Sequence, residues 1–173
     1  MRFTYCPNCG EKLGARVLGD EGSVPWCEHC GRPWFEMFSS CVIILVTNDN
    51  GEVALLKQDF PPNPYLKLVA GYIKPGESAE ESAEREVMEE IGIRLKELHL
   101  VRTIWFEKAQ QLMIAFHGVA ENTDFTLSPN EVQGAGWYPV DEAVGLVRPP
   151  TPGSASAFLV NWYRERVKKQ TEH

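Results

Sequence analysis

The chain has 173 residues, 43% hydrophobic and 24% charged, a composition typical of one soluble globular domain with at most a small appendage. Its 17 Lys and Arg against 24 Asp and Glu give a net charge of −7, which argues against a broad surface for long nucleic acids but leaves room for a small anionic ligand held through metal ions. No apolar run approaches the ~20 residues of a membrane-spanning helix, and the N-terminal residues lack the layout of a secretion signal, so we expect a cytoplasmic protein.

Four cysteines near the N-terminus form two C-x2-C pairs, Cys6 with Cys9 and Cys27 with Cys30. Two residues between thiolates let one tight turn direct both sulfurs at the same ion, and the glycine after each pair relieves the backbone. The spacing predicts a closed, structural Zn²⁺ site in a segment too short for much of a core. Two disulfides in a secreted protein are the alternative, and the lack of a secretion signal favours zinc.

The next segments alternate between predicted strands and turns. The β-branched, apolar run 41–47 predicts a strand, in which we interpret Cys41 as a buried residue and not as a reactive thiol. Residues 48–51 form a turn signal, and 52–57 predict a returning strand. Prolines at 61, 62 and 64 indicate a loop, after which Leu66 to Ala70 predict a strand that ends at Gly71.

A helix is predicted between Ser78 and Gly92. Ser78 and Glu81 match the S-x-x-E capping box, and Gly92 is typical of a helix C-terminus. Apolar residues recur every four positions between these ends and give one buried stripe. Its members are Ala79, Ala83, Val87 and Ile91.

Three glutamates crowd the last turns of this helix: Glu86, Glu89 and Glu90. At about 100° per residue, Glu90 lies at the edge of the apolar stripe, Glu86 roughly 40° further round, and Glu89 roughly 60° beyond Glu86. The i, i+4 pair Glu86 and Glu90 repels by roughly 0.2–0.5 kcal/mol even when exposed, and partial burial raises that repulsion. Divalent cations such as Mg²⁺ would offset it, whereas a solvated acidic face is the alternative that the helix alone leaves open.

The remaining chain predicts a mixed α/β or α+β fold. Strands are expected at 97–106, 111–119 and around Trp137 and Tyr138, with a polar loop at 122–130. A short helix is expected at 140–147 and, after a break at prolines 149, 150 and 152, a closing helix at 154–169. The candidate core residues of the closing helix are Ala157, Phe158, Val160, Trp162 and Val167.

The spacing around the glutamates extends well beyond the helix. Five residues separate Gly71 from Glu77, and seven separate Glu77 from Arg85. With the glutamates and Gly92, this matches the Nudix box G-x5-E-x7-R-E-U-x-E-E-x-G-U, where U is apolar, at nine specified positions over 23 residues. The chain therefore resembles the Nudix hydrolases. The resemblance implies an α/β/α sandwich around a mixed sheet and hydrolysis of a nucleoside diphosphate linked to another group.

The resemblance also implies roles for the residues of the box. It implies that Mg²⁺ or Mn²⁺ is bound by Glu86, Glu89, Glu90 and the backbone carbonyl of Ala70. Arg85 would orient these glutamates and pair with Glu77. Metal ions neutralise the diphosphate and lower the pKa of bound water, and a carboxylate can then accept the proton of that water.

A zinc ribbon directly before a Nudix domain resembles the NADH pyrophosphatase branch, with a ribbon at 1–37 and a Nudix domain at 38–173. One further region of the chain, residues 129–132 with 136–138, is similar to a region of that branch that carries an additional metal-binding glutamate. The resemblance therefore implies that Glu131 binds metal, and a plain loop carboxylate is the alternative. Tyr72 stands where the branch has an aromatic residue that stacks on a base, although a core tyrosine is the alternative. The branch's S-Q-P-W-P-F-P-x-S motif is absent: residues 103–111 read TIWFEKAQQ, in which we expect Trp105 and Phe106 to pack in the core.

Several functions follow from these resemblances. The leading hypothesis is a metal-dependent pyrophosphohydrolase acting on a small nucleotide such as NADH, NAD, ADP-ribose or a flavin dinucleotide. A module that binds nucleotides or RNA without cleavage is one alternative, and removal of nicotinamide-nucleotide caps from RNA is another. The resemblance further implies a homodimer, and capped RNA is the one nucleic-acid partner that we consider.

Overall fold

The computed structural model describes residues 3–58, 64–129, 131–151 and 154–171. The chain divides into two compact units, Met1–Ser39 and Ser40–His173. The residues at 61, 62, 130 and 152, which the sequence assigns to loops and breaks, lie outside the described residues. No helix in the described part of the chain is long and apolar enough to cross a membrane.

The N-terminal unit is a three-stranded antiparallel sheet in the order β1 (Gly14–Val17), β2 (Ser23–Cys27) and β3 (Arg32–Pro33). A 3₁₀ turn, η1 (Gly19–Glu21), connects the first two strands. Each C-x2-C pair closes the same tight turn. The N–H of Gly10 donates to the carbonyl of Cys6, and that of Gly31 to the carbonyl of Cys27, both at 2.9 Å. Both glycines have positive φ, so the expectation that glycine relieves these turns is confirmed.

The second unit is built around a six-stranded sheet. Five strands follow the order β7 (Leu95–Phe106), β8 (Gln111–Ala120), β4 (Ser39–Thr47), β5 (Val53–Lys57), β9 (Gly134–Tyr138). The sixth, β6 (Val69–Tyr72), pairs with β4 from Cys41 to Ile44, and β5 meets β4 further along, at Thr47. The short β6 therefore lies where the Nudix box begins. A 3₁₀ turn, η2 (Glu107–Ala109), joins β7 to β8.

One predicted strand is displaced along the chain. The strand expected from Leu66 to Ala70 runs instead from Val69 to Tyr72. Leu66 and Lys67 form only isolated bridges, Leu66 with Val147 and Lys67 with Leu56. These residues look like a strand in sequence, but their partners belong to two different elements, so no continuous ladder forms.

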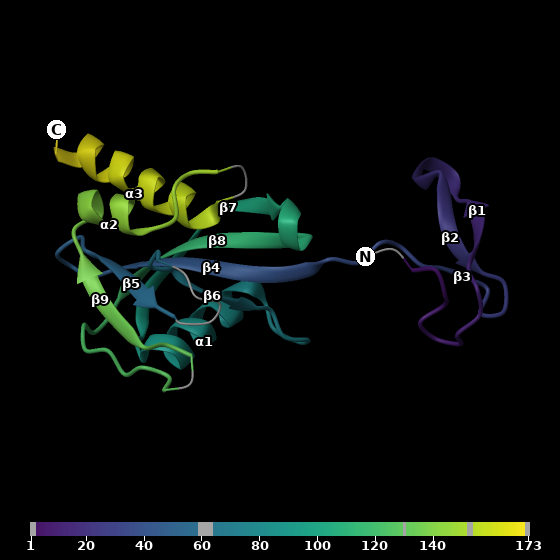
Figure 1. The fold of residues 1–173 in the computed structure, drawn as a ribbon, viewed down its shortest axis with the longest axis horizontal. Coiled ribbons are helices and arrows are strands. Elements are labelled where there is room, and N and C mark those ends of the chain that lie inside the picture. The colour runs from purple at the N-terminus through teal and green to yellow at the C-terminus, as the bar shows by residue number, and fades with distance from the viewer. Residues whose placement is uncertain (1–2, 59–63, 130, 152–153, 172–173) are drawn as a thin grey trace. The chain divides into compact units, whose positions relative to one another are not determined.

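Helices cover both faces of the sheet (Figure 1). Alternate side chains of β4 point to opposite faces: Val42, Ile44 and Val46 join the core under α1 (Ala79–Ile91), whereas Ile43 and Leu45 join the core under the other two helices. Those are α2 (Val140–Leu146) and α3 (Ala155–Thr171). This arrangement confirms the α/β/α sandwich.

The predicted helix α1 is confirmed together with both of its ends. The Ser78 hydroxyl accepts a hydrogen bond from the Glu81 N–H at 3.2 Å, and the Glu81 carboxylate accepts one from the Ser78 N–H at 2.8 Å. Gly92 adopts the left-handed conformation, and its N–H donates to the carbonyl of Met88 at 3.1 Å. The ends of the glutamate helix are therefore set by local hydrogen bonds.

Two expectations about aromatic packing have different outcomes. In α3, Ala157 and Val160 are buried as predicted, and the other three candidates are partly buried against the same core. The expectation that Trp105 packs in the core is wrong, because this side chain is 42% exposed and its indole N–H donates to Glu107 at 2.6 Å. It lies near the end of β7, an edge strand of the sheet that the described residues form. Phe106 is half-buried.

Candidate functional site

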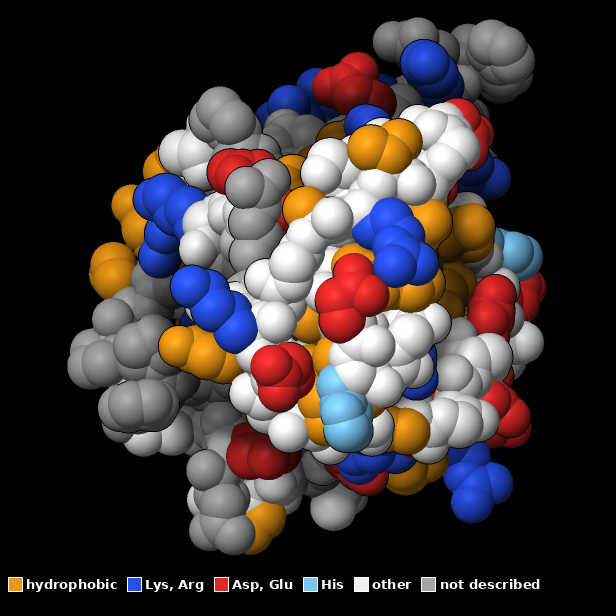
Figure 2. All heavy atoms as spheres, turned by 90° about the vertical axis from the view of Figure 1, so that its right-hand side faces the viewer, with side chains coloured by type: hydrophobic (Ala, Val, Ile, Leu, Met, Phe, Trp, Pro, Cys, Tyr) orange, Lys and Arg blue, Asp and Glu red, His pale blue; other side chains and the backbone are white. Residues whose placement is uncertain are grey.

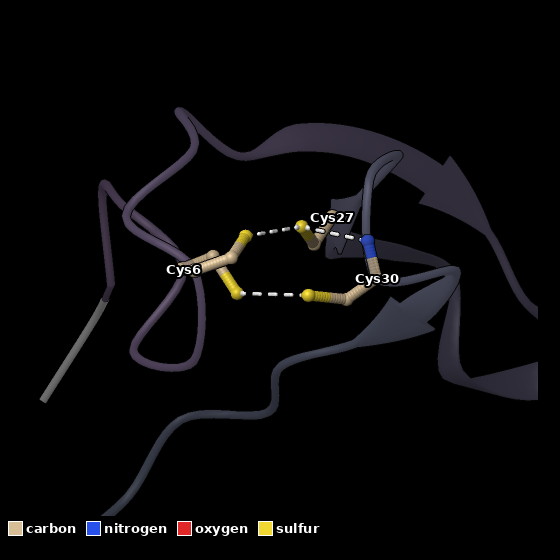
Figure 3. Close-up of side chains that lie close together, drawn as sticks. Cys6, Cys27 and Cys30 are labelled. Atoms are coloured by element: carbon tan, nitrogen blue, oxygen red, sulfur yellow. Dashed lines mark hydrogen bonds between the residues drawn. The ribbon is translucent and has the colours of Figure 1, made fainter.

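The four N-terminal cysteines converge on one point, and Figure 3 shows the side chains of Cys6, Cys27 and Cys30 in this cluster. All four sulfur atoms lie within 4.8 Å of one another. The sulfurs of Cys6 and Cys30 are 3.8 Å apart, and those of Cys9 and Cys27 are 3.5 Å apart. These distances exceed the S–S bond length of about 2.05 Å, so the cysteines are not joined as disulfides.

The cluster has the dimensions of a tetrahedral zinc site. Zn–S bonds of about 2.3 Å in tetrahedral geometry place sulfur atoms about 3.8 Å apart, close to the two measured separations. Cys6 and Cys27 are buried, and the N–H of Cys30 points at the Cys27 sulfur, 3.3 Å away. Four sulfur ligands would fill all positions around the ion, so the residues fit a structural metal and leave no open position for chemistry.

A second candidate site is a pocket of about 650 Å³ in the larger unit, where α1, β6 and the segment before β9 meet. It holds most of the residues that the Nudix resemblance singles out: Ala70, Tyr72, Arg85, Glu86, Glu89, Glu90 and Glu131. We call it the glutamate pocket. Glu77 does not line it but contacts it through Arg85.

The three helix glutamates differ sharply in exposure. Glu90 is 5% exposed, the Glu86 side chain 13% and the Glu89 side chain 48%. This order follows the angles that the helical periodicity predicts, with Glu90 nearest the apolar stripe. The carboxylates therefore form a series from the buried core to the mouth of the pocket.

Arg85 connects the acidic groups to one another. Its guanidinium donates to both carboxylate oxygens of Glu77, at 2.6 and 2.9 Å, to Glu86 at 2.6 Å and to Glu89 at 2.9 Å. It also donates to the carbonyl of Tyr72 at 3.1 Å. These bonds lower the pKa of Glu77 to about 2 and raise the pKa of Arg85 above its usual range. The Arg85 side chain thus holds the loop and the helix of the box in one arrangement.

Glu90 is an unusual buried acid. Burial, followed by the negative charges of Glu86 and Glu131, raises the pKa of Glu90 to about 8, although a hydrogen bond from the backbone of Ala70 and the charge of Lys67 oppose the shift. Its Oε2 atom is buried and has no hydrogen-bond partner among the described residues. An unpartnered carboxylate oxygen beside other carboxylates is the donor set of a hard divalent cation, so the residues fit Mg²⁺ or Mn²⁺.

Gly71 is required for close packing at the floor of the pocket. A Cβ at this position would overlap the carboxylate of Glu86. The next residue, Tyr72, is 60% exposed, which excludes the alternative of a core tyrosine. Its hydroxyl accepts a hydrogen bond from the Gln111 side chain at 2.7 Å, which orients the ring at the rim.

Other residues of the pocket carry no signal in the sequence. Lys74 forms an ion pair with Glu89 at 3.5 Å, and Gln58 and Gln133 line the wall. Lysine and glutamine are common on every protein surface, and Lys74 occupies an unspecified position of the box, whereas Gln58 and Gln133 come from segments outside it. Only the tertiary structure brings them to the glutamates.

Comparison with known proteins agrees with this geometry. Residues 37–160 match the family model described as the NUDIX domain. The chain is 29% identical over 162 residues to an NAD-capped RNA hydrolase NudC of Stutzerimonas stutzeri, covering 94% of this chain and 56% of the relative. It is likewise 29% identical over 159 residues to NudC of Escherichia coli O9:H4, covering 90% of this chain and 58% of the relative.

The chain thus spans a little more than half the length of these curated relatives. Among solved structures, a NUDIX hydrolase from Nitrosomonas europaea is similar in fold, with a TM-score of 0.70 at 20% identity, covering 96% of this chain and 93% of that one. The matched family model covers well over half of the residues and contains the whole glutamate helix. The protein belongs to the NUDIX family.

Proposed function

We propose that this protein is a metal-dependent pyrophosphohydrolase that cleaves the diphosphate linkage of a nucleoside diphosphate joined to a second group. The observation that carries the proposal is the buried, unpartnered oxygen of Glu90 beside Glu86 and Glu131, in a pocket open to a ligand. Burying a carboxylate oxygen without a hydrogen-bond partner costs free energy, and a bound cation would offset that cost.

In this proposal the metal ligands are Glu86, Glu89, Glu90, Glu131 and the backbone carbonyl of Ala70. A bound Mg²⁺ or Mn²⁺ would neutralise the diphosphate and lower the pKa of an attacking water. Arg85 holds Glu86 and Glu89 in position, and Glu77 fixes Arg85 in turn. A carboxylate of the cluster accepts the proton of the water as the water oxygen bonds to one phosphorus, and the bond from that phosphorus to the bridging oxygen breaks, so that the other phosphate leaves with the bridging oxygen.

The cysteine cluster would hold a structural Zn²⁺ that stabilises the small N-terminal unit. We propose that the ribbon spans 1–37 and the catalytic domain 38–173, and that the protein acts as a cytoplasmic homodimer. These boundaries and the dimer rest on the resemblance of the sequence to the NADH pyrophosphatase branch.

For the substrate, we favour a dinucleotide of the NADH or NAD type, or ADP-ribose, because the named relatives act on NAD-capped RNA. Tyr72 is exposed at the rim of the pocket, where a base could stack on its ring. This chain differs from the branch in that it lacks the S-Q-P-W-P-F-P-x-S motif. A substrate screen is therefore used to identify the group that is joined to the nucleoside diphosphate.

The capped end of an RNA is the second candidate, favoured by the names of the relatives. The N-terminal unit offers this function little electrostatic support: residues 1–39 contain four Lys and Arg against five Asp and Glu. On the face drawn in Figure 2, acidic and basic side chains are interspersed and no patch of a single charge forms among the described residues. Such a face lacks a continuous track for a phosphate backbone.

The test is a substrate screen with Mg²⁺ or Mn²⁺ and identification of products by mass spectrometry. The panel contains NADH, NAD, ADP-ribose, a flavin dinucleotide and NAD-capped RNA. We expect the wild type to release a nucleoside monophosphate, Glu90→Gln to lose about 100-fold or more of kcat/KM, and the exposed control Glu84→Gln to retain it. The proposal would be refuted if neither the wild type nor Glu90→Gln hydrolysed any substrate of the panel. Salt-dependent binding of RNA without turnover would instead favour a binding module.

A further inference from the structure

A second cavity, of about 320 Å³, lies beside the glutamate pocket in the larger unit. It is bounded by the segment before β6, the hairpin between β7 and β8, and the first turn of α3. We call it the distal pocket and define it by Lys67, Lys108, Arg148, Tyr65, Phe106 and Gln111. None of these residues belongs to the Nudix box.

Two hydrogen bonds connect the walls of the two pockets. The Gln111 side-chain amide donates to the Tyr72 hydroxyl at 2.7 Å, and the Lys67 ammonium donates to the side-chain amide oxygen of Gln58 at 3.0 Å. Gln111 and Lys67 line the distal pocket, whereas Tyr72 and Gln58 line the glutamate pocket. A molecule held at the glutamates through its diphosphate therefore has the distal pocket within reach of its second half.

The two pockets have opposite charge. The described lining of the glutamate pocket has an excess of acidic side chains, with four glutamates against Lys74 and Arg85. The distal pocket has three cationic side chains, and none of its described lining residues is Asp or Glu, in a chain whose net charge is −7. The N-terminus of the 17-residue helix α3 reaches the same wall through Ser154, Ala155 and Ser156 and adds the positive end of its dipole.

Each cation is placed by a specific feature of the fold. Lys108 lies in η2, between β7 and β8. Lys67 and Arg148 follow directly after the parallel bridge between Leu66 and Val147, which brings these two cations to neighbouring positions. The acid next to Lys108 in sequence, Glu107, accepts hydrogen bonds from Trp105 at 2.6 Å and from Gln110 at 3.1 Å.

The three cations need not serve the same group. Lys67 stands at the junction with the glutamate pocket, where its charge acts on Glu90 and where it can meet the diphosphate itself. Lys108 and Arg148 are exposed, and both line the distal pocket but not the glutamate pocket. The described residues that line the distal pocket include no Asp or Glu that could neutralise these two cations. Tyr65 and Phe106 add aromatic surface suited to a base or another flat group.

We propose that the distal pocket binds the second half of the substrate and that this half carries a phosphate beyond the two of the scissile diphosphate. The inference rests on the proposed function for the position of the diphosphate. Lys108 and Arg148 bind the additional phosphate, because an arginine fork and a lysine ammonium beside a helix N-terminus are the groups that recognise a phosphate dianion. They act as specificity residues and leave the chemistry at the glutamates unchanged.

The experiment compares substrates that differ by one phosphate: NADPH against NADH, and coenzyme A against dephospho-coenzyme A. We expect kcat/KM to be at least about tenfold higher for the phosphorylated member of one pair or both. The double variant Lys108→Gln/Arg148→Gln should abolish this preference by lowering only the rate with the phosphorylated substrate. The control Lys168→Gln removes an exposed cation of α3 outside both pockets and should change neither rate.

A melting curve of each variant separates loss of recognition from loss of folding. Equal kcat/KM within both pairs, or a preference that survives the double variant, would overturn the inference while the proposed function stands. If the wild type hydrolyses no substrate, the proposed function fails, and calorimetric binding decides the inference by itself. Adenosine 2′,5′-bisphosphate should then bind more tightly than AMP to the wild type but not to the double variant, and equal affinities would overturn it.

Discussion

The backbone of Gly71 lies directly against the carboxylate of Glu86, with no room for a Cβ between them. Arg85 donates a hydrogen bond of 2.6 Å to the same carboxylate. Gly71, the first residue of the Nudix box, and Glu86 of α1 are thus in contact, although 14 residues lie between them in sequence. This contact explains why the motif begins with glycine.

We predict that Gly71→Ala lowers kcat/KM by about 100-fold, because the new methyl group displaces Glu86 from its position among the proposed metal ligands. The requirement for Mg²⁺ should shift to higher concentration. A magnesium titration of initial rates checks this prediction. Gly145→Ala is the matched control, since a Cβ there meets nothing within 4 Å, and it should behave as wild type. An unchanged magnesium titration in Gly71→Ala would contradict the prediction.

A conservative change at Arg85 should also be severe. Lysine keeps the charge but cannot donate to Glu77, Glu86 and Glu89 together, because it lacks the planar fork of donors. We expect Arg85→Lys to lower kcat by about 100-fold or more, with the exposed Arg94→Lys as a control that remains active. Steady-state kinetics at saturating metal provides the measurement. Full activity of Arg85→Lys would mean that the positive charge alone is sufficient.

Metal analysis tests the cysteine cluster. The purified protein should contain one Zn²⁺ per chain, and Cys27→Ser should lose it, because Cys27 is one of four sulfurs within 4.8 Å of one another. Cys41→Ala should keep the zinc, since Cys41 is buried in β4 and lies outside the cluster. Elemental analysis by mass spectrometry distinguishes the two variants. Zinc retained at full stoichiometry in Cys27→Ser would rule out the four-thiolate site.

The stability of the larger unit should depend on His117 in mildly acidic solution. This ring bonds to the Thr47 hydroxyl at 2.9 Å and contacts Tyr163, with centroids 5.2 Å apart. Burial, with smaller effects from the charges of His99 and Arg166, lowers the pKa of His117 to about 4. The unfolded chain takes up the proton near pH 6.5, so stability is complete above that pH and falls as the pH drops towards 4.

The loss at pH 5 should be up to about 2 kcal/mol, less the screening that partial exposure allows. Urea unfolding of wild type and His117→Gln at pH 7.5 and pH 5.0 measures it. The variant is expected to lose less stability than wild type over this range, because glutamine does not titrate. Equal losses in the two proteins would assign the acid sensitivity to other groups.

Local interactions explain why the glutamate helix could be predicted from the sequence. Its capping box, its terminal glycine and its apolar period act within a few residues, so the bounds of α1 and the order of exposure of Glu86, Glu89 and Glu90 follow from the chain alone. The turns after Cys6 and Cys27 are local in the same way. The family assignment depends on these short-range patterns.

The errors arose where partners lie far apart in sequence. Leu66 and Lys67 bond to two separate segments rather than to one strand, and Trp105 lies on β7, an edge strand of the sheet that the described residues form. Apolar composition predicts burial, but which strand ends at the edge of a sheet is decided by pairing across the whole unit. Tyr72 is exposed for a related reason, because it ends the short strand β6 at the rim of the pocket.

The sequence was therefore sufficient to identify the family from the residue types and spacings of the Nudix box. In the same way, the box and the cysteine pairs identified the acidic and thiol groups as candidate metal ligands, because each pattern lies within a short stretch of chain. The tertiary structure alone decided the unpartnered oxygen of Glu90, the bond between Gln111 and Tyr72, and the gathering of Lys67, Lys108 and Arg148 around one cavity. The physical reason is that burial and pocket charge depend on elements packed together from distant parts of the chain, which periodicity and spacing do not encode.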